Sequence, residues 1–258
     1  MTGVVTKNAA GTLAYVGIDD TDNLESRGTG YRARQLAARI MDAGLGVVLG
    51  ATRHQLFVSP DIPYTSHNSA ACLAVAMHGE ASTPELVGLT RRFLADESAP
   101  GSDAGFCVRR DPALPAALLE FGRRAKEEVL TRREAHSLAA ACVCHLEGVT
   151  GDHGGVIGAL AAVGLRCGGA DGRFIWVRGI RELAGRTLPL ARLLRATGIE
   201  RLETREGLPV TDADSTIALG DWPRPILRLH RAVLLVENCN DLSNADWRVV
   251  AKDYIKQF

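Results

Sequence analysis

The stretch that decides the fold is 13-LAYVGIDDTD-22, an apolar run that ends in three aspartates within four residues. Such a short run, rich in aromatic and β-branched residues, is typical of a buried strand. Asp19, Asp20 and Asp22 then lie at the carboxyl end of that strand, where open α/β sheets bind their ligands. Three neighbouring carboxylates repel one another unless a cation or hydrogen-bond donors neutralise them. We therefore predict a cation-binding loop here, with a solvated acidic turn as the alternative.

A helix N-terminus is expected directly after this loop, at Arg27-Gly28-Thr29-Gly30. Thr29 can cap a helix whose apolar residues at 33, 36, 37 and 40 share one face, and Gly44 ends it at the expected place. The N–H groups and the positive dipole end of such a helix suit a phosphate. Acidic ligands for Mg²⁺ beside an anion-binding helix are typical of phosphoryl transfer.

The remaining elements alternate along the chain with mostly short connections. Further strands are expected at 47–52, 55–58, 70–77, 106–108, 174–177 and 228–237, and helices at 83–95, 115–141 and 188–196. A glycine-rich turn from His153 feeds another helix, which we expect to end at Gly164. This alternation predicts an α/β fold, with α+β character and mixed sheets.

The amino-acid composition argues against a general polyanion-binding protein and against a membrane protein. Thirty Lys and Arg balance 30 Asp and Glu over 258 residues, so broad electrostatic capture of a polyanion is not expected. The longest uncharged apolar run, 154–165, is shorter than the ~20 residues of a membrane span, and the N-terminus lacks the order of a signal peptide. We therefore expect a cytoplasmic protein without a membrane partner. Cys142 and Cys144 lack the second cysteine pair of a structural zinc site and are interpreted as incidental thiols.

Three ordered motifs resemble the archaeal tRNA 2-agmatinylcytidine (agmatidine) synthetases. Gly17–Asp22 with Gly28–Tyr31 is similar to the family's opening G-I-D-D-T-D-S…C-T-T-Y. Thr65–Ala70 resembles T-R-G-N-G-A, and Gly155–Gly164 is similar to G-x-I-G-A-L-A-A-I-G. The resemblance runs from about residue 12 to about residue 180, and more loosely toward the end of the chain.

The resemblance implies a kinase-like domain at 12–59 and 127–258, with a ferredoxin-like domain at 60–126 between its two parts. In this family ATP is cleaved, the wobble cytidine of a tRNA is phosphorylated, and agmatine displaces the phosphate. Asp19, Asp20 and Asp22 match the residues that hold Mg²⁺ and the nucleotide phosphates. Thr29 matches a threonine that is itself phosphorylated, so we expect a phosphate contact or phospho-acceptor there.

Five further residues are expected to bind the nucleotide: Gly28, Gly30, Asn68, Gly155 and Gly158. Tight helix packing is the alternative interpretation of Gly155 and Gly158. The family's cysteine and second threonine are replaced here by Gly28 and Gly30, and two of its arginines by Ser66 and Gly154. The family's OB-fold and zinc ribbon, which hold tRNA, are also not expected in this chain.

The sequence thus predicts an ATP- and Mg²⁺-dependent phosphotransferase or ligase-like enzyme that activates an RNA base or a small molecule. The resemblance allows tRNA as the acceptor, but the neutral charge argues against it. A non-catalytic nucleotide-binding module with the same fold is the alternative. A dehalogenase-type phosphatase fits less well, because one register places Gly17 at the nucleophile and the other places Leu24 at the Thr/Val position.

Overall fold

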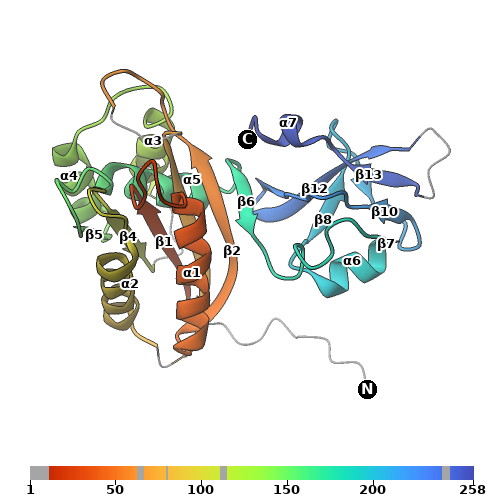
Figure 1. Cartoon of the computed structure of the whole chain (residues 1–258), viewed down its shortest axis with the longest axis horizontal. Coiled ribbons are helices and arrows are strands. Elements are labelled where there is room, and N and C mark those ends of the chain that lie inside the picture. The colour runs from red at the N-terminus through yellow and green to blue at the C-terminus, as the bar shows by residue number, and fades with distance from the viewer. Residues whose placement is uncertain (1–11, 63–66, 80, 111–114, 240–244) are drawn as a thin grey trace.

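The computed structural model of the chain describes residues 12–62, 67–79, 81–110, 115–239 and 245–258. Figure 1 shows an N-terminal lobe of sheet and helices and a C-terminal lobe of shorter strands, with β6 (Arg173–Trp176) between them. Strand pairing continues through β6, because it bonds to one strand of each lobe. Within the described residues, no helix is long and apolar enough to cross a membrane.

The N-terminal lobe is built on four antiparallel strands in the order β4-β1-β3-β2. The elements are β1 (Leu13–Asp19), α1 (Thr29–Asp42), β2 (Gly46–Gln55), β3 (Ser69–Met77), α2 (Thr83–Glu97) and β4 (Gly105–Arg109). This βαββαβ succession is that of a ferredoxin-like unit. The first three elements precede residue 60 and the last three follow it. The sheet therefore does not separate at the expected border between 59 and 60, and the domain division stays a prediction.

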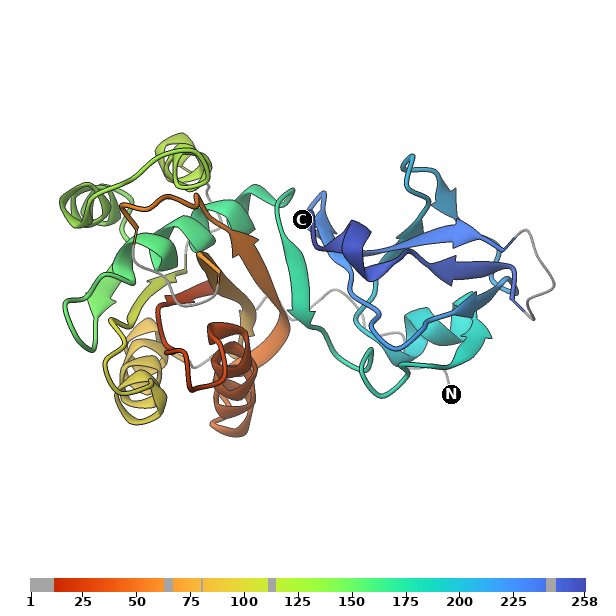
Figure 2. The same cartoon turned by 45° about the horizontal axis from the view of Figure 1, so that its top comes forward.

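Helices cover both faces of this sheet (Figure 2). On one face lie α1 and α2, which pack on Ala14, Val16 and Ile18 of β1. On the other lie α3 (Ala116–Arg124), α4 (Arg132–Ala141) and α5 (Val156–Gly168), which pack against residues such as Tyr15. The alternation along β1 assigns odd-numbered residues, Asp19 among them, to the α5 face. The strand β5 (His145–Gly148) extends the sheet beyond β4.

The C-terminal lobe continues the pairing from β6 to β11 and then to β12. Its elements are β7 (Thr187–Pro189), α6 (Leu190–Ala196), β8 (Arg201–Glu203), β9 (Pro209–Val210), β10 (Thr216–Ala218), β11 (Ile226–Arg228), β12 (Arg231–Asn238), β13 (Trp247–Val249) and α7 (Lys252–Ile255). Two pairs, β8 with β12 and β10 with β13, are parallel, whereas the others are antiparallel. The predicted fold class, α/β with mixed sheets, is confirmed.

The structure differs from the expected elements in four places. Instead of the two strands expected at 47–52 and 55–58, there is one strand, β2, which ends at Gln55, so residues 56–58 are not in a strand. The helix at 115–141 is two helices, because Thr131 and Glu134 form a capping box that starts α4. The strand at 228–237 is a hairpin that turns at Leu229 and His230, both with positive φ. The helix α5 continues past Gly164 and ends at Gly168.

Glycines let α5 approach its neighbours closely. A Cβ atom on Gly17 of β1 would lie 2.1 Å from the carbonyl oxygen of Ala159 in α5. A Cβ on Gly164 would lie 2.3 Å from the carbonyl oxygen of Leu118 in α3. Gly164 therefore serves packing rather than helix termination.

Replacing Gly17 with alanine should lower the free energy of unfolding by about 2–3 kcal/mol, because the new methyl group meets helix backbone and not a flexible side chain. Gly79→Ala is the matched control, since a Cβ there has no neighbour within 4 Å. Urea denaturation of both variants measures the difference. Equal midpoints would show that α5 does not pack on β1 at this distance.

Candidate active site

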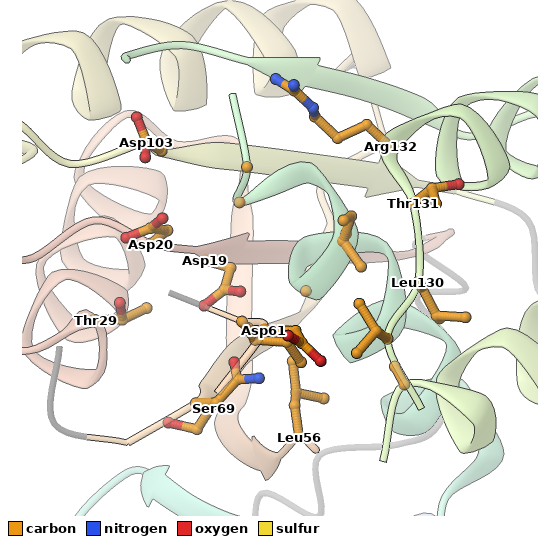
Figure 3. A pocket seen from close by; sticks show the side chains of 18 of the residues that line it. Asp19, Asp20, Thr29, Leu56, Asp61, Ser69, Asp103, Leu130, Thr131 and Arg132 are labelled. Atoms are coloured by element: carbon orange, nitrogen blue, oxygen red, sulfur yellow. The ribbon is translucent and has the colours of Figure 1, made fainter. Parts of the chain in front are cut away.

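A cavity of about 390 Å³ lies at the carboxyl end of β1, between the acidic loop and the start of α5. Figure 3 shows Asp20 and Thr29 on one side of it and the Leu130–Arg132 segment on the other. We call it the acidic cavity. The expected site residues that line it are Asp19, Asp20, Asp22, Thr29, Asn68, Gly155 and Gly158.

Asp19 ends β1 and lies against the first turn of α5. A Cβ atom on Gly158 would lie only 1.8 Å from Oδ2 of Asp19, so the helix reaches the carboxylate only because residue 158 is glycine. Burial, together with the charges of Asp20 and Asp22, raises the pKa of Asp19 to about 8. Without a cation, this side chain is therefore mostly protonated at neutral pH.

Asp20 follows with a positive φ of 52°, a conformation that aspartate tolerates better than most residues. Burial and the charges of Asp103, Asp22 and Asp152 raise the pKa of its carboxyl to about 6. Asp103 and Asp152 come from the loops before β4 and α5, and Oδ1 of Asp103 accepts the backbone N–H of Asp152 at 2.7 Å. Repulsion among acids from three separate loops is thus concentrated on Asp20.

Asp22 holds the start of α1. Its Oδ1 accepts the backbone N–H of Thr29 at 2.9 Å and the Thr29 hydroxyl at 2.7 Å. Thr29 is the first helical residue and Gly28 is the N-cap, so the expected capping by Thr29 is wrong. The hydroxyl also accepts a bond from Thr21 at 3.1 Å. A carboxylate at this distance can take the proton of the hydroxyl that it contacts.

The glycine-rich turn is held mainly by contacts within the protein. The N–H of Gly155 donates to the carbonyl of Asp103 at 2.9 Å, and the N–H of Gly154 donates to Oδ1 of Asp152 at 2.8 Å. A Cβ atom on Gly155 would lie 2.6 Å from the carbonyl oxygen of Asp19. Close packing accounts for glycine at 155 and 158, and their contact with a phosphate stays a prediction.

The other expected binding residues lie nearby. Asn68 donates its side-chain amide to the carbonyl of Phe57 at 2.6 Å. Gly28 and Gly30 line an adjoining pocket rather than the acidic cavity. Thr65 and Ser66, which belong to the second family-like motif, lie outside the described residues.

Sequence reasoning missed several acids of the cavity. Among the described lining residues there are seven carboxylates, Asp19, Asp20, Asp22, Asp61, Asp103, Glu128 and Asp152, and one arginine, Arg132. Asp152 precedes the glycine-rich turn directly, and that position was a usable signal. Asp103 and Glu128 lie in segments without a motif, and tertiary packing alone brings them here.

The carboxylates of the acidic cavity suit a divalent cation, but they do not enclose one without further ligands. In the described part of the chain, no three His, Cys, Asp or Glu side chains are arranged to hold a metal ion, and the Cys142–Cys144 segment is no exception. Mg²⁺ is usually held by one or two carboxylates together with substrate phosphates. Asp19 and Asp20 can supply such carboxylates, since Oδ1 of Asp22 already bonds to Thr29.

The chain is similar to proteins of known and unknown function. No protein-family model matches it. An uncharacterized protein of Methanocaldococcus jannaschii is 31% identical over 159 residues, which are 58% of this chain and 49% of that protein. The chain thus covers about half the length of this curated relative.

Solved structures similar to the chain include TiaS, the tRNAIle2 agmatidine synthetase. A tRNA fluorescent labelling enzyme and the complex of TiaS with tRNAIle2 and ATP each match with a TM-score of 0.52, and apo TiaS with 0.50. All three are 28% identical over 59% of this chain, and the match covers 35–36% of theirs. These comparisons show a TiaS-like fold in that part of the chain.

The acidic cavity predicts a pH-dependent stability. The pKa of Asp19 is raised from 3.8 to about 8, so the folded state binds this proton more tightly than the unfolded state. Stability should therefore fall as the pH rises from about 4 to about 8 and level off above that. Asp19→Asn should remove most of the slope between pH 6 and 8. Denaturation across this range without divalent cations measures it, and identical profiles for both proteins would contradict the assigned ionisation.

Proposed function

We propose that this chain is an ATP- and Mg²⁺-dependent enzyme of the phosphotransferase or ligase type. The observation that carries the proposal is the acidic cavity, where seven carboxylates face one arginine beside the start of α5. A polyphosphate would be repelled by this cavity unless a divalent cation accompanied it. The similarity to TiaS, which has been solved with ATP, supports ATP as the nucleotide.

Each expected site residue takes a role in this proposal. Asp19 and Asp20 hold Mg²⁺ together with nucleotide phosphates, and Asp22 orients the hydroxyl of Thr29. Thr29 contacts the transferred phosphate or accepts it. Bound Mg²⁺ would neutralise charge on the phosphate oxygens. The binding surface is completed by Gly28, Gly30, Asn68, Gly155 and Gly158.

The acceptor is an RNA base or a small molecule. TiaS binds tRNAIle2, and the similarity extends that proposal to this chain. The zero net charge of 30 basic and 30 acidic residues favours a smaller acceptor. We further propose a cytoplasmic location, and a division into a ferredoxin-like part and a kinase-like part.

A non-catalytic nucleotide-binding module is the second candidate. Among the described lining residues, Arg132 is the one cation, and it already donates to the carbonyl of Asp152. A cavity with so few cations offers little stabilisation for charge that develops during phosphoryl transfer. A dehalogenase-type phosphatase is disfavoured, since Gly17, the nucleophile position in one register, lies beneath Ala159.

Mg²⁺ should tighten ATP binding at least tenfold, and Asp20→Asn should remove most of that gain, because it removes a carboxylate that faces the cation. Asp214→Asn, an exposed acid of the C-terminal lobe, makes the same charge change as a control. Isothermal titration calorimetry with and without Mg²⁺ measures both. Absence of Mg²⁺-dependent binding would refute the proposal. ATP binding without release of ADP or AMP, whatever acceptor is supplied, would favour the non-catalytic nucleotide-binding module.

If Thr29 is a phospho-acceptor, incubation with ATP and Mg²⁺ should add one phosphate to the protein, and Thr29→Val should abolish it. Thr29→Ser keeps a hydroxyl within reach of Asp22 and should retain the modification. Intact-mass and peptide mass spectrometry read out the site. Phosphate on another residue, or equal labelling of the valine variant, would assign Thr29 to structure alone.

A further inference from the structure

A second pocket, of about 540 Å³, opens beside the acidic cavity at the start of α1. The two share a wall that includes Asp22 and Thr29. The charge of the second pocket is opposite, because Arg27, Arg34 and Arg53 line it and Asp22 is its one carboxylate among the described lining residues. We call it the arginine pocket.

Three further arginines, from β6 and the C-terminal lobe, lie close enough to Arg34 or Arg53 to interact with them electrostatically, although none of the three is among the described lining residues of the pocket. They are Arg173, Arg181 and Arg224, and together with the three lining residues they form what we call the arginine cluster. Burial, together with the charge of Arg173, lowers the pKa of Arg53 to about 10. Burial lowers the pKa of Arg224 to about 10 as well, with contributions from Arg181, Arg34 and Arg173. An arginine whose pKa is about 10 still carries a positive charge at neutral pH.

The charges of the arginine cluster lack acidic partners. Within the ranges that the structure describes, none of the six guanidinium groups has a carboxylate oxygen within 4.0 Å. Four of these arginines donate hydrogen bonds to neutral oxygens. The acceptors are the Gly30 carbonyl for Arg34 at 2.8 Å, the Gln55 side-chain amide for Arg53 at 2.9 Å, the Ile175 carbonyl for Arg224 at 2.9 Å and the Lys256 carbonyl for Arg173 at 3.4 Å.

Several arginines elsewhere in the molecule pair with carboxylates. Arg91 pairs with Glu147 at 2.6 Å, and Arg123 pairs with Glu120 and Glu127 at 2.7 Å each. The arginine pocket is distinguished by its composition, because three arginines of the cluster line one concave space and its described lining residues include a single carboxylate. Half-buried like charges repel one another, and a bound anion would relieve that repulsion. Guanidinium groups also match phosphate oxygens in pairs of parallel hydrogen bonds.

We propose that the arginine pocket binds the phosphate groups of a compact, multiply charged small molecule, which is the second substrate of the reaction proposed above. Its role as second substrate rests on the proposed function, whereas the binding itself does not. The pocket volume lies within the range of about 300–1,000 Å³ typical of small-ligand sites. An RNA backbone would favour a longer basic stripe, whereas the seven carboxylates of the acidic cavity adjoin this pocket across the shared wall.

Inorganic pyrophosphate serves as the probe, titrated into the full chain by calorimetry in the presence of EDTA. Removing divalent cations keeps pyrophosphate out of the acidic cavity, which repels it. We expect one binding site per chain. Arg34→Gln and Arg53→Gln should each weaken binding about tenfold or more, because each removes a charge-assisted contact.

Arg123→Gln is the matched control, since it makes the same charge change at an exposed, paired arginine and should leave the affinity unchanged. Arg53→Lys keeps the charge and should recover part of the binding lost in Arg53→Gln, which separates a charge effect from a folding defect. Urea midpoints of all variants are measured alongside.

The outcomes separate this inference from the proposed function. If ATP binds with Mg²⁺ but pyrophosphate does not bind, or binds equally to Arg34→Gln and Arg53→Gln, the arginine pocket is not an anion site. If pyrophosphate binds as expected and ATP does not, the proposed function fails and the anion site stands. If a single-stranded RNA of ten uridines binds more tightly than pyrophosphate and loses affinity in both variants, the ligand is a nucleic acid, and the small-molecule proposal is overturned.

Discussion

The close contact between β1 and α5 is the constraint on which the candidate site depends. Gly17 has no side chain, so the backbone of α5 at Ala159 lies directly on the strand. That approach brings the next residue on the same face, Asp19, against Gly158 in the first turn of the helix. A carboxylate enclosed in this way loses water, which raises its pKa. The packing of two backbones thus determines the ionisation of the acidic loop.

How far the sequence predicts this arrangement depends on how local each signal is. The strand at 13–19, the acids that follow it and the glycine-rich turn are short patterns with a direct physical meaning, and all three lie where α5 meets β1. The break in the expected helix at 115–141 was also encoded locally, in Thr131 and Glu134, but a long helix-forming composition concealed it. That break matters, since Leu130–Arg132 forms the far wall of the acidic cavity (Figure 3).

Charges that arrive by tertiary packing could not be predicted. Asp103 reaches Asp20 from a surface loop more than 80 residues away, and no spacing rule connects them. Arg53 and Arg173 become neighbours because β2 pairs with β6 in a register that places the two residues opposite each other. Registers between strands distant in sequence follow from the assembled core and not from either strand alone.

The zero net charge of the chain conceals a separation of charge at short range. Acids gather on one side of Thr29 and arginines without a carboxylate partner on the other. Among the described lining residues, Asp22 is the one carboxylate that belongs to both pockets. Its Oδ1 fixes the backbone N–H and the hydroxyl of Thr29 together, so the wall between the pockets is set by two hydrogen bonds. A cation-bound phosphate on the acidic side and an anion on the basic side would both be attracted toward this wall. Thr29 therefore lies on the boundary between the negatively charged acidic cavity and the positively charged arginine pocket.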